Sequence, residues 1–239
     1  MPPVRFRRPR PARDPLVEAA EAAEALFAAG RYEQARTAFA TCIRDHQAQL
    51  PAHLDDPAFN GRIGGLLNNL GLTLLRMHRA GEAVEVLQAA VAVFDGLARL
   101  DDPDRWRPRA AGSLQTLASA LAQNGQRDRA LTVSREAVEL RRLGPYDLDL
   151  ARALRMFATV RAAAGAELDE ALSAMDEAMA VHLTLLQRTG RAALDELYTT
   201  ELAMAAVLER LGRSADAARV AAQARSRHLD GLPDPGRRA

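Results

Sequence analysis

The sequence contains no lysine, since all 32 basic residues among its 239 are arginines. This absence excludes the phosphate-binding lysine of a P-loop, a Schiff-base lysine and a lysine general base. It is also typical of a GC-rich bacterial genome, so we expect a bacterial protein. The formal net charge is only +1, and overall charge therefore favours neither nucleic acid nor an anionic membrane as a partner.

Cysteine is nearly absent as well. Cys42 is the single cysteine, so the chain cannot form an internal disulfide or a thiolate metal cage. We expect Cys42 to be a buried, inert thiol at a small-residue position of a helix. No HExxH motif or Cys/His cluster is present, and we expect no metal and no cofactor. The histidines are scattered along the chain at His46, His53, His78, His182 and His228.

Long hydrophobic runs are also missing. No stretch approaches the ~18 apolar residues of a membrane span, and residues 1–15, MPPVRFRRPRPARDP, lack the apolar segment of a secretory signal. We therefore expect a cytoplasmic protein with no membrane partner, a disordered basic arm at 1–15 and a flexible tail at 229–239. The arm has few aromatic residues among its arginines, which disfavours nucleic acid as its partner.

Aromatic residues make up only 4% of the chain, whereas 48% of its residues are hydrophobic. The abundant alanines suit close packing of helix on helix. A pattern of large and small residues recurs five times, and in residues 66–91 it reads Leu67, Leu70, Gly71 and then Ala83. A small residue in the first helix lets the second approach closely, and a glycine between them supplies the positive φ of a helix C-cap. The recurring alanines are spaced 48, 47, 41 and 46 residues apart: Ala35, Ala83, Ala130, Ala171 and Ala217.

Some positions depart from this pattern. Arg161 and Glu201 stand where apolar residues are expected, and one extra residue separates Gly165 from its signature alanine. His78 occupies the turn position that glycine holds in the other repeats, for which we expect a structural role. We therefore regard the register of the fourth repeat as the least defined.

The spacing is that of the tetratricopeptide repeat, although longer than its standard 34 residues. With LNNL in the first helix and Asp-Pro in the connector, it resembles the repeats of kinesin light chains and bacterial arrays attached to nucleotide-binding regulatory ATPases. The resemblance covers about residues 16–228. It implies an all-α, right-handed superhelical solenoid of about five helix-turn-helix repeats, over 16–50, 62–100, 109–143, 148–187 and 195–228.

Two stretches could suggest other chemistry. NGRIGGLLNNLG is rich in glycine, but it is not GxGxxG and no strand precedes it, so we expect Asn60 to cap a helix and the glycines to allow tight packing. The acidic residues of RLDDPDRW are typical of a connector, because Asp-Pro starts turns and caps helices. No nucleophile–base pair is visible, and we do not expect an enzyme.

We expect the ligand-binding surface to be the concave groove that the first helix of each repeat lines. Amide side chains can both donate to and accept from an extended peptide, and arginines can bind carboxylates. In the repeats that this chain resembles, the asparagine matching Asn69 hydrogen-bonds the backbone of a bound peptide. Alternatively, these positions form a solvated face with hydrogen bonds between helices. The candidate groove residues are Asn68, Asn69, Arg76, Gln115, Thr116, Ser119, Arg152 and Arg155.

We therefore expect a non-catalytic scaffold or adaptor that binds an extended protein segment carrying acidic or C-terminal carboxylate groups near Arg76, Arg152 and Arg155. One alternative is a regulatory sensor module that controls a separate transcription factor or ATPase. Another is a structural protein that self-assembles through its terminal repeats, for which a homodimer through the last repeat is the simplest form. The sequence identifies neither the partner nor the pathway.

Overall fold

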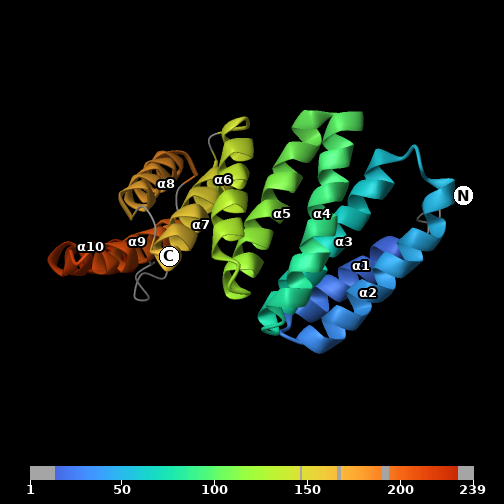
Figure 1. Cartoon of the computed structure of the whole chain (residues 1–239), viewed down its shortest axis with the longest axis horizontal. Coiled ribbons are helices and arrows are strands. Elements are labelled where there is room, and N and C mark those ends of the chain that lie inside the picture. The colour runs from blue at the N-terminus through green and yellow to red at the C-terminus, as the bar shows by residue number, and fades with distance from the viewer. Residues whose placement is uncertain (1–13, 146, 166–167, 190–193, 231–239) are drawn as a thin grey trace, which may run out of the picture.

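The structure, a computed structural model, describes residues 14–145, 147–165, 168–189 and 194–230. Those residues form ten α-helices and one short 3-10 helix, η1, and contain no strand, which confirms the all-α prediction. The helices follow one another in antiparallel pairs along the long axis of the molecule (Figure 1). Their bounds are α1 Pro15–Ala28, α2 Tyr32–Gln49, η1 Leu50–Ala52, α3 Pro57–Arg76, α4 Ala80–Leu100, α5 Pro103–Gln123, α6 Arg127–Arg142, α7 Leu148–Ala164, α8 Leu168–Thr189, α9 Leu194–Arg210 and α10 Ser214–Asp230.

In three of the helix pairs, the first helix starts with an Asp-Pro dipeptide. The carboxylates of Asp14, Asp56 and Asp102 each accept a backbone N–H of the first turn, over 2.9–3.0 Å. The following proline fits the first helical position, where no backbone N–H is needed. These signals start α3 and α5 at Pro57 and Pro103, ahead of the repeat bounds expected at 62 and 109.

The prediction that Asn60 caps α3 was wrong. The N-cap is Asp56, whose side chain accepts the backbone N–H of Phe59 over 2.9 Å. Asn60 lies within the first turn instead, and its Nδ2 donates to the carbonyl oxygen of Leu54 over 3.1 Å. A carboxylate is the stronger acceptor at this helix end because the helix dipole favours negative charge there.

His78 confirms its predicted place in the turn of the second pair. Its φ is +58°, in the left-handed region that Gly125, for example, adopts at +76° in the next pair. A residue with a Cβ is strained in this conformation by about 1 kcal/mol. The turn geometry of the repeat therefore overrides the residue's own preference.

The seams within the pairs are as tight as the repeat pattern predicts. All five signature alanines are at most 1% exposed. A Cβ added to Gly71 would lie 2.4 Å from Cγ of Leu87 within the pair, and between pairs one added to Gly61 on α3 would lie 2.3 Å from the ring of Trp106 on α5. Cys42 is 3% exposed, as expected of a buried thiol.

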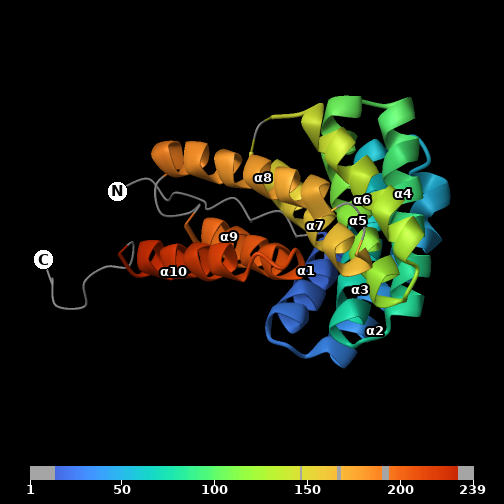
Figure 2. The same ribbon diagram turned by 60° about the vertical axis from the view of Figure 1, so that its left-hand side comes forward.

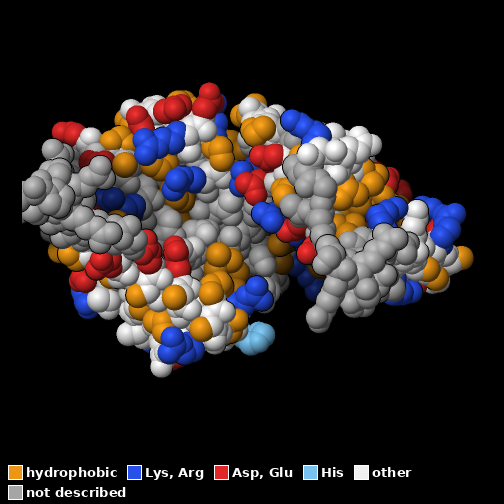
Figure 3. Space-filling model, turned by 180° about the vertical axis from the view of Figure 1, so that it is seen from behind, with side chains coloured by type: hydrophobic (Ala, Val, Ile, Leu, Met, Phe, Trp, Pro, Cys, Tyr) orange, Lys and Arg blue, Asp and Glu red, His pale blue; other side chains and the backbone are white. Residues whose placement is uncertain are grey.

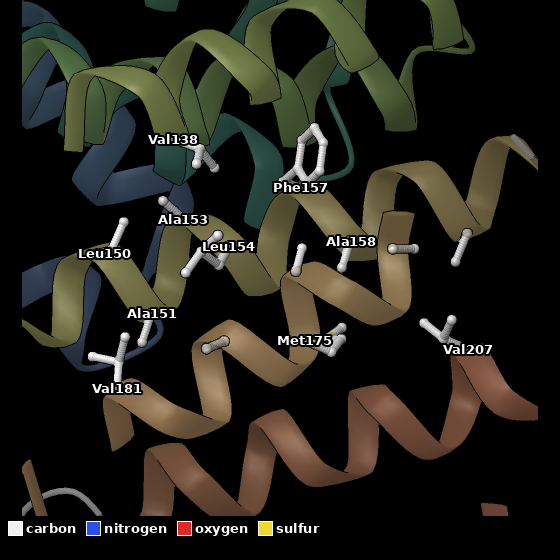
Figure 4. Packing of buried hydrophobic residues seen from close by; sticks show 14 of the residues in the cluster. Val138, Leu150, Ala151, Ala153, Leu154, Phe157, Ala158, Met175, Val181 and Val207 are labelled. Atoms are coloured by element: carbon white, nitrogen blue, oxygen red, sulfur yellow. The ribbon is translucent and has the colours of Figure 1, made fainter. Parts of the chain in front are cut away.

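The fourth repeat and its neighbours share the largest apolar cluster. Across the α7–α8 seam, Ala151 faces Val181 and Ala158 faces Met175 (Figure 4). Val138 from α6 and Val207 from α9 belong to the same cluster, so the core runs through the seam between repeats. The repeats are therefore joined into one continuous array.

The two unexpected charges of the repeat pattern are both buried. Arg161 is 2% exposed and pairs with Glu170, and its guanidinium carbon also lies 4.7 Å from the ring centroid of Phe157. Glu201 is 3% exposed and pairs with Arg227. Each ion pair joins the two helices of its own repeat, so a charged contact replaces an apolar one inside the hairpin.

The first helices form the inner row of the array. Each contacts the first helix of the next pair, from α1 with α3 to α7 with α9, whereas no comparable contact joins successive second helices in the described chain. The more closely spaced row must lie on the concave side of a curved stack. The helices also change direction along the array, from steep in α3–α5 to nearly horizontal in α9 and α10 (Figure 1), and α8–α10 extend to one side of the stack (Figure 2).

Among the described residues, no helix is long and apolar enough to cross a membrane.

Candidate functional site

All eight predicted groove residues lie on three consecutive helices of the inner row, α3, α5 and α7. Arg76 and Arg152 are exposed, and the other six are half-buried. One face of the molecule is hollowed near its middle, with basic and acidic side chains around the hollow (Figure 3). Because α3, α5 and α7 are neighbours in the inner row, a chain bound along them could contact several of these residues together.

The two asparagines have different surroundings. Nδ2 of Asn69 donates to Oε1 of Glu24 on α1 over 3.1 Å, and the backbone carbonyl of Asn69 accepts from the hydroxyl of Thr73. Oδ1 of Asn68 is buried and has no hydrogen-bond partner among the described residues. Asn69 therefore links two repeats, whereas Asn68 keeps an unused acceptor.

The polar residues of α5 make mostly local hydrogen bonds. The hydroxyl of Thr116 donates to the carbonyl oxygen of Gly112 over 3.1 Å, and that of Ser119 accepts from Gln123 over 3.3 Å. Gln115 reaches the carbonyl oxygen of Asp149 on α7 over 3.5 Å, a long contact that a ligand group could replace.

Arg152 and Arg155 converge on one carboxylate from the next repeat. Nε and Nη2 of Arg152 lie 2.9 and 2.6 Å from Oε1 of Glu196 on α9, and Nη2 of Arg155 lies 3.4 Å from Oε2. Burial raises the pKa of Glu196, but the hydrogen bond from Arg152 and both arginine charges outweigh it and lower that pKa. Glu196 therefore already occupies the place expected for a ligand carboxylate.

Arg76 is separate from this group. It ends α3, and within the described residues no ion pair joins it to Arg152, Arg155 or Glu196. Burial lowers the pKa of Arg155, whereas the hydrogen bond to Glu196 raises the pKa of Arg152. Both remain cations at neutral pH, because a guanidinium does not lose its proton in proteins.

A pocket of about 370 Å³ opens beside the asparagines. The sequence did not single out several of the residues that line it, namely Arg109 and Ser113 on α5, Arg141 on α6 and Asp149 on α7. Nη1 of Arg141 lies 3.1 Å from Oδ2 of Asp149. The pocket thus brings together an amide, a hydroxyl and a charged pair from four helices; its lining is Gly65, Asn68, Asn69, Phe94, Pro108, Arg109, Gly112, Ser113, Arg141 and Asp149.

Arg141 was not predicted as a site residue, because only the first helix of each pair was expected to line the groove. It follows Ala130 by the same number of residues as Phe94 follows Ala83. Phe94 is a buried aromatic residue at this position of the second repeat, whereas the third repeat has an arginine there. This difference was the signal in the sequence that could have indicated Arg141. Gly112 leaves room for it, since a Cβ there would lie 3.5 Å from Nη2 of Arg141.

A hydroxyl–imidazole contact does occur in the described chain, between Thr200 and Nε2 of His182 over 3.0 Å. Both side chains are fully buried, and burial lowers the pKa of His182 to about 4. A substrate could not reach this pair, which therefore belongs to the packing of α8 on α9. The described residues also contain no group of three or more His, Cys, Asp or Glu side chains that could hold a metal ion.

Neither a protein-family model nor a curated protein matches the chain. Solved structures do match its fold. BtubC (BKLC) from P. vanneervenii superposes with a TM-score of 0.69 at 20% identity, over 94% of this chain and 85% of that chain. A kinesin light chain protein of nearly identical TPR-like repeats from Podosopora anserina gives 0.67 at 18% identity, over 92% and 97%. MamA gives 0.55 at 15% identity, over 94% and 97%. The chain thus has the fold of a tetratricopeptide-like solenoid.

Proposed function

We propose that the protein is a scaffold that binds an extended protein segment along its concave face. The observation that carries this proposal is the row of amide, hydroxyl and guanidinium groups on α3, α5 and α7, the closely spaced inner helices. Side chains that both donate and accept match the alternating N–H and C=O groups of an extended backbone. This function requires no catalysis and no cofactor.

The charge at the α7 end supports a preference for acidic segments. Among the described residues, the ion pairs of Arg141, Arg152 and Arg155 involve two carboxylates, those of Asp149 and Glu196. A carboxylate of the bound segment would share Arg155, whose contact with Glu196 is the longest of the set at 3.4 Å. We therefore assign the acidic or C-terminal group of the ligand to this end of the groove.

The test is a fluorescence-polarisation screen of labelled, randomised hexapeptides, followed by titration of the best binders against variants. Asn69→Ala and Arg155→Ala should each weaken binding by about five- to tenfold, as expected for the loss of a hydrogen bond to a ligand backbone or carboxylate. Gln88→Ala on α4 and Arg44→Ala on α2 are the matched controls, because both residues are exposed on second helices. If both groove variants bind as tightly as the controls, the groove is not the binding surface.

A further inference from the structure

Three residues that line the pocket beside Asn68, each from a different helix, carry a buried polar atom with no hydrogen-bond partner in the part of the chain that the structure describes. These atoms are Oδ1 of Asn68 on α3, Oγ of Ser113 on α5 and Nε of Arg141 on α6. Ser113 is 1% exposed and the side chain of Arg141 is 11% exposed. Burying a polar atom without a hydrogen-bond partner costs free energy, so three such atoms around one pocket indicate that a polar group binds there.

The three atoms differ in whether they donate or accept hydrogen bonds. The amide oxygen of Asn68 can only accept, Nε of Arg141 can only donate, and the hydroxyl of Ser113 can do either. A carboxylate would accept from Arg141 but oppose the oxygen of Asn68. An ammonium group would donate to Asn68 but be repelled by Arg141. A carboxamide satisfies both, because its oxygen accepts while its NH₂ donates.

We propose that this pocket is a subsite for a carboxamide, the side chain of an asparagine or glutamine in the segment that the groove binds. The assignment rests on the proposed function for the rest of that segment. The ligand oxygen accepts from Nε of Arg141, the ligand NH₂ donates to Oδ1 of Asn68, and the hydroxyl of Ser113 completes the ring of hydrogen bonds.

The surroundings fit a neutral group. Asp149 pairs with Arg141 over 3.1 Å and with Arg152 over 3.3 Å, so its carboxylate offsets part of the charge of Arg141 and holds the guanidinium in place. Phe94 and Pro108 supply apolar walls for the methylene groups of the ligand. Arg109 lies over the ring of Trp106, 5.4 Å from its centroid, and adds a positive charge at the rim. A carboxylate is therefore the closest competitor.

Two glycines leave the floor of the pocket open. Gly65 and Gly112 hold equivalent places in their repeats, and a Cβ on Gly65 would meet no atom within 4 Å. The volume of about 370 Å³ exceeds that of one amide side chain, so the adjoining backbone of the segment also fits. Because a Cβ at position 65 meets no atom, a larger side chain there would extend into this space.

The test uses single-residue probes, so that it does not depend on the groove. N-acetylglutamine methylamide and its isostere N-acetylglutamate methylamide are titrated at pH 7 into the ¹⁵N-labelled full chain. The glutamine probe should shift the amide resonances of Gly65 and Gly112 saturably, and the glutamate probe should bind about fivefold more weakly, as expected for one lost hydrogen bond. Ser113→Ala should weaken binding of the glutamine probe by a similar factor.

Gly65→Leu should abolish binding of the glutamine probe at Gly112. Gly96→Leu on α4 is the matched control, because Gly96 is also a helix-interior glycine whose Cβ would meet no atom within 4 Å, and it does not line the pocket. The control should bind as the wild type does.

Equal or tighter binding of the glutamate probe would overturn the carboxamide assignment. Absence of any shift at Gly65 and Gly112 with both probes would overturn it too, since the pocket would then hold only water. If the glutamine probe fails while the hexapeptides still depend on Asn69, this inference falls and the proposed function stands. If the probe binds but the hexapeptides do not depend on the groove, the pocket stands as an amide site and the scaffold proposal falls.

Discussion

At the scale of single residues, glycine has two opposite roles in this chain. Gly61 and Gly71 stand where a neighbouring side chain leaves no room for a Cβ, with Leu87 packed against Gly71. Gly65 and Gly96 are equally helical, yet a Cβ on either would meet nothing within 4 Å. The first two glycines are required by packing, whereas packing does not require the second two, which leave their helices less stable.

We therefore expect opposite effects from the same substitution. Gly96→Ala should raise the free energy of unfolding by about 0.5–1 kcal/mol, because alanine restricts the unfolded chain and has the higher helix propensity. Gly71→Ala should lower it by about 1–3 kcal/mol, because the added methyl overpacks the seam against Leu87. Urea unfolding measures both, and a stabilising Gly71→Ala would contradict the close contact between α3 and α4.

The buried pair of Glu201 and Arg227 should be sensitive to which partner is removed. Arg227→Ala leaves the 3% exposed carboxylate of Glu201 without its cation, and we expect a loss of about 2–3 kcal/mol. The loss is less than for a fully buried pair, since the side chain of Arg227 is 30% exposed.

Replacing Glu201 instead of Arg227 should lower the free energy of unfolding much less. Glu201→Leu restores the apolar residue that the repeat pattern expects and frees Arg227 to turn toward water. We expect its free energy of unfolding to lie within about 1 kcal/mol of the wild type in the same urea experiment. Equal losses for the two variants would show that the asymmetry in burial does not determine the energetics.

At the scale of elements, the helical hairpins could be predicted because a small-residue seam recurs five times at nearly constant spacing. The start of α3 was placed too late, since the capping signal of Asp56 and Pro57 lies before the apolar pattern begins. The pocket could not be predicted from first helices alone, because Arg141 reaches it from a second helix. Pairing of Arg152 and Arg155 with Glu196 depends on how repeat five is stacked on repeat four, which the spacing does not define.

The junction of α8 and α9 should make stability depend on pH. Burial lowers the pKa of His182 from 6.5 to about 4, with Glu196, Arg152 and Arg155 as the nearby charges. Between these values the unfolded chain binds the proton and the folded chain does not, so the free energy of unfolding falls as pH falls from 6.5 to 4. The total loss in the free energy of unfolding is about 3 kcal/mol, and this loss is complete below pH 4.

Urea unfolding at several pH values between 4 and 7 measures this effect. His182→Gln keeps a group that can bond Thr200 but does not titrate, so the fall in stability should be smaller by about 3 kcal/mol in this variant. His78→Asn, at an exposed turn position, should keep the slope of the wild type. Carboxyl groups such as Asp95, whose pKa burial raises, affect all three proteins alike and cancel in the comparison.

At the scale of the whole molecule, the main helix contacts of the described chain join successive helices and neighbouring repeats. In such a solenoid, stability is close to a sum of repeat and interface terms. Removing one end should therefore leave the rest folded, unlike in a globular domain with a single shared core.

We expect a chain that ends at residue 193, without α9 and α10, to keep the first four hairpins. Its thermal midpoint should fall, because the truncation removes Val207 from the cluster of repeat four and leaves Arg152 and Arg155 without Glu196. Circular dichroism at 222 nm should decrease in proportion to the helical residues removed, and amide protection in α3–α5 should be retained. Loss of protection throughout α3–α5 would show that distant repeats stabilise one another, a coupling that nearest-neighbour packing does not provide.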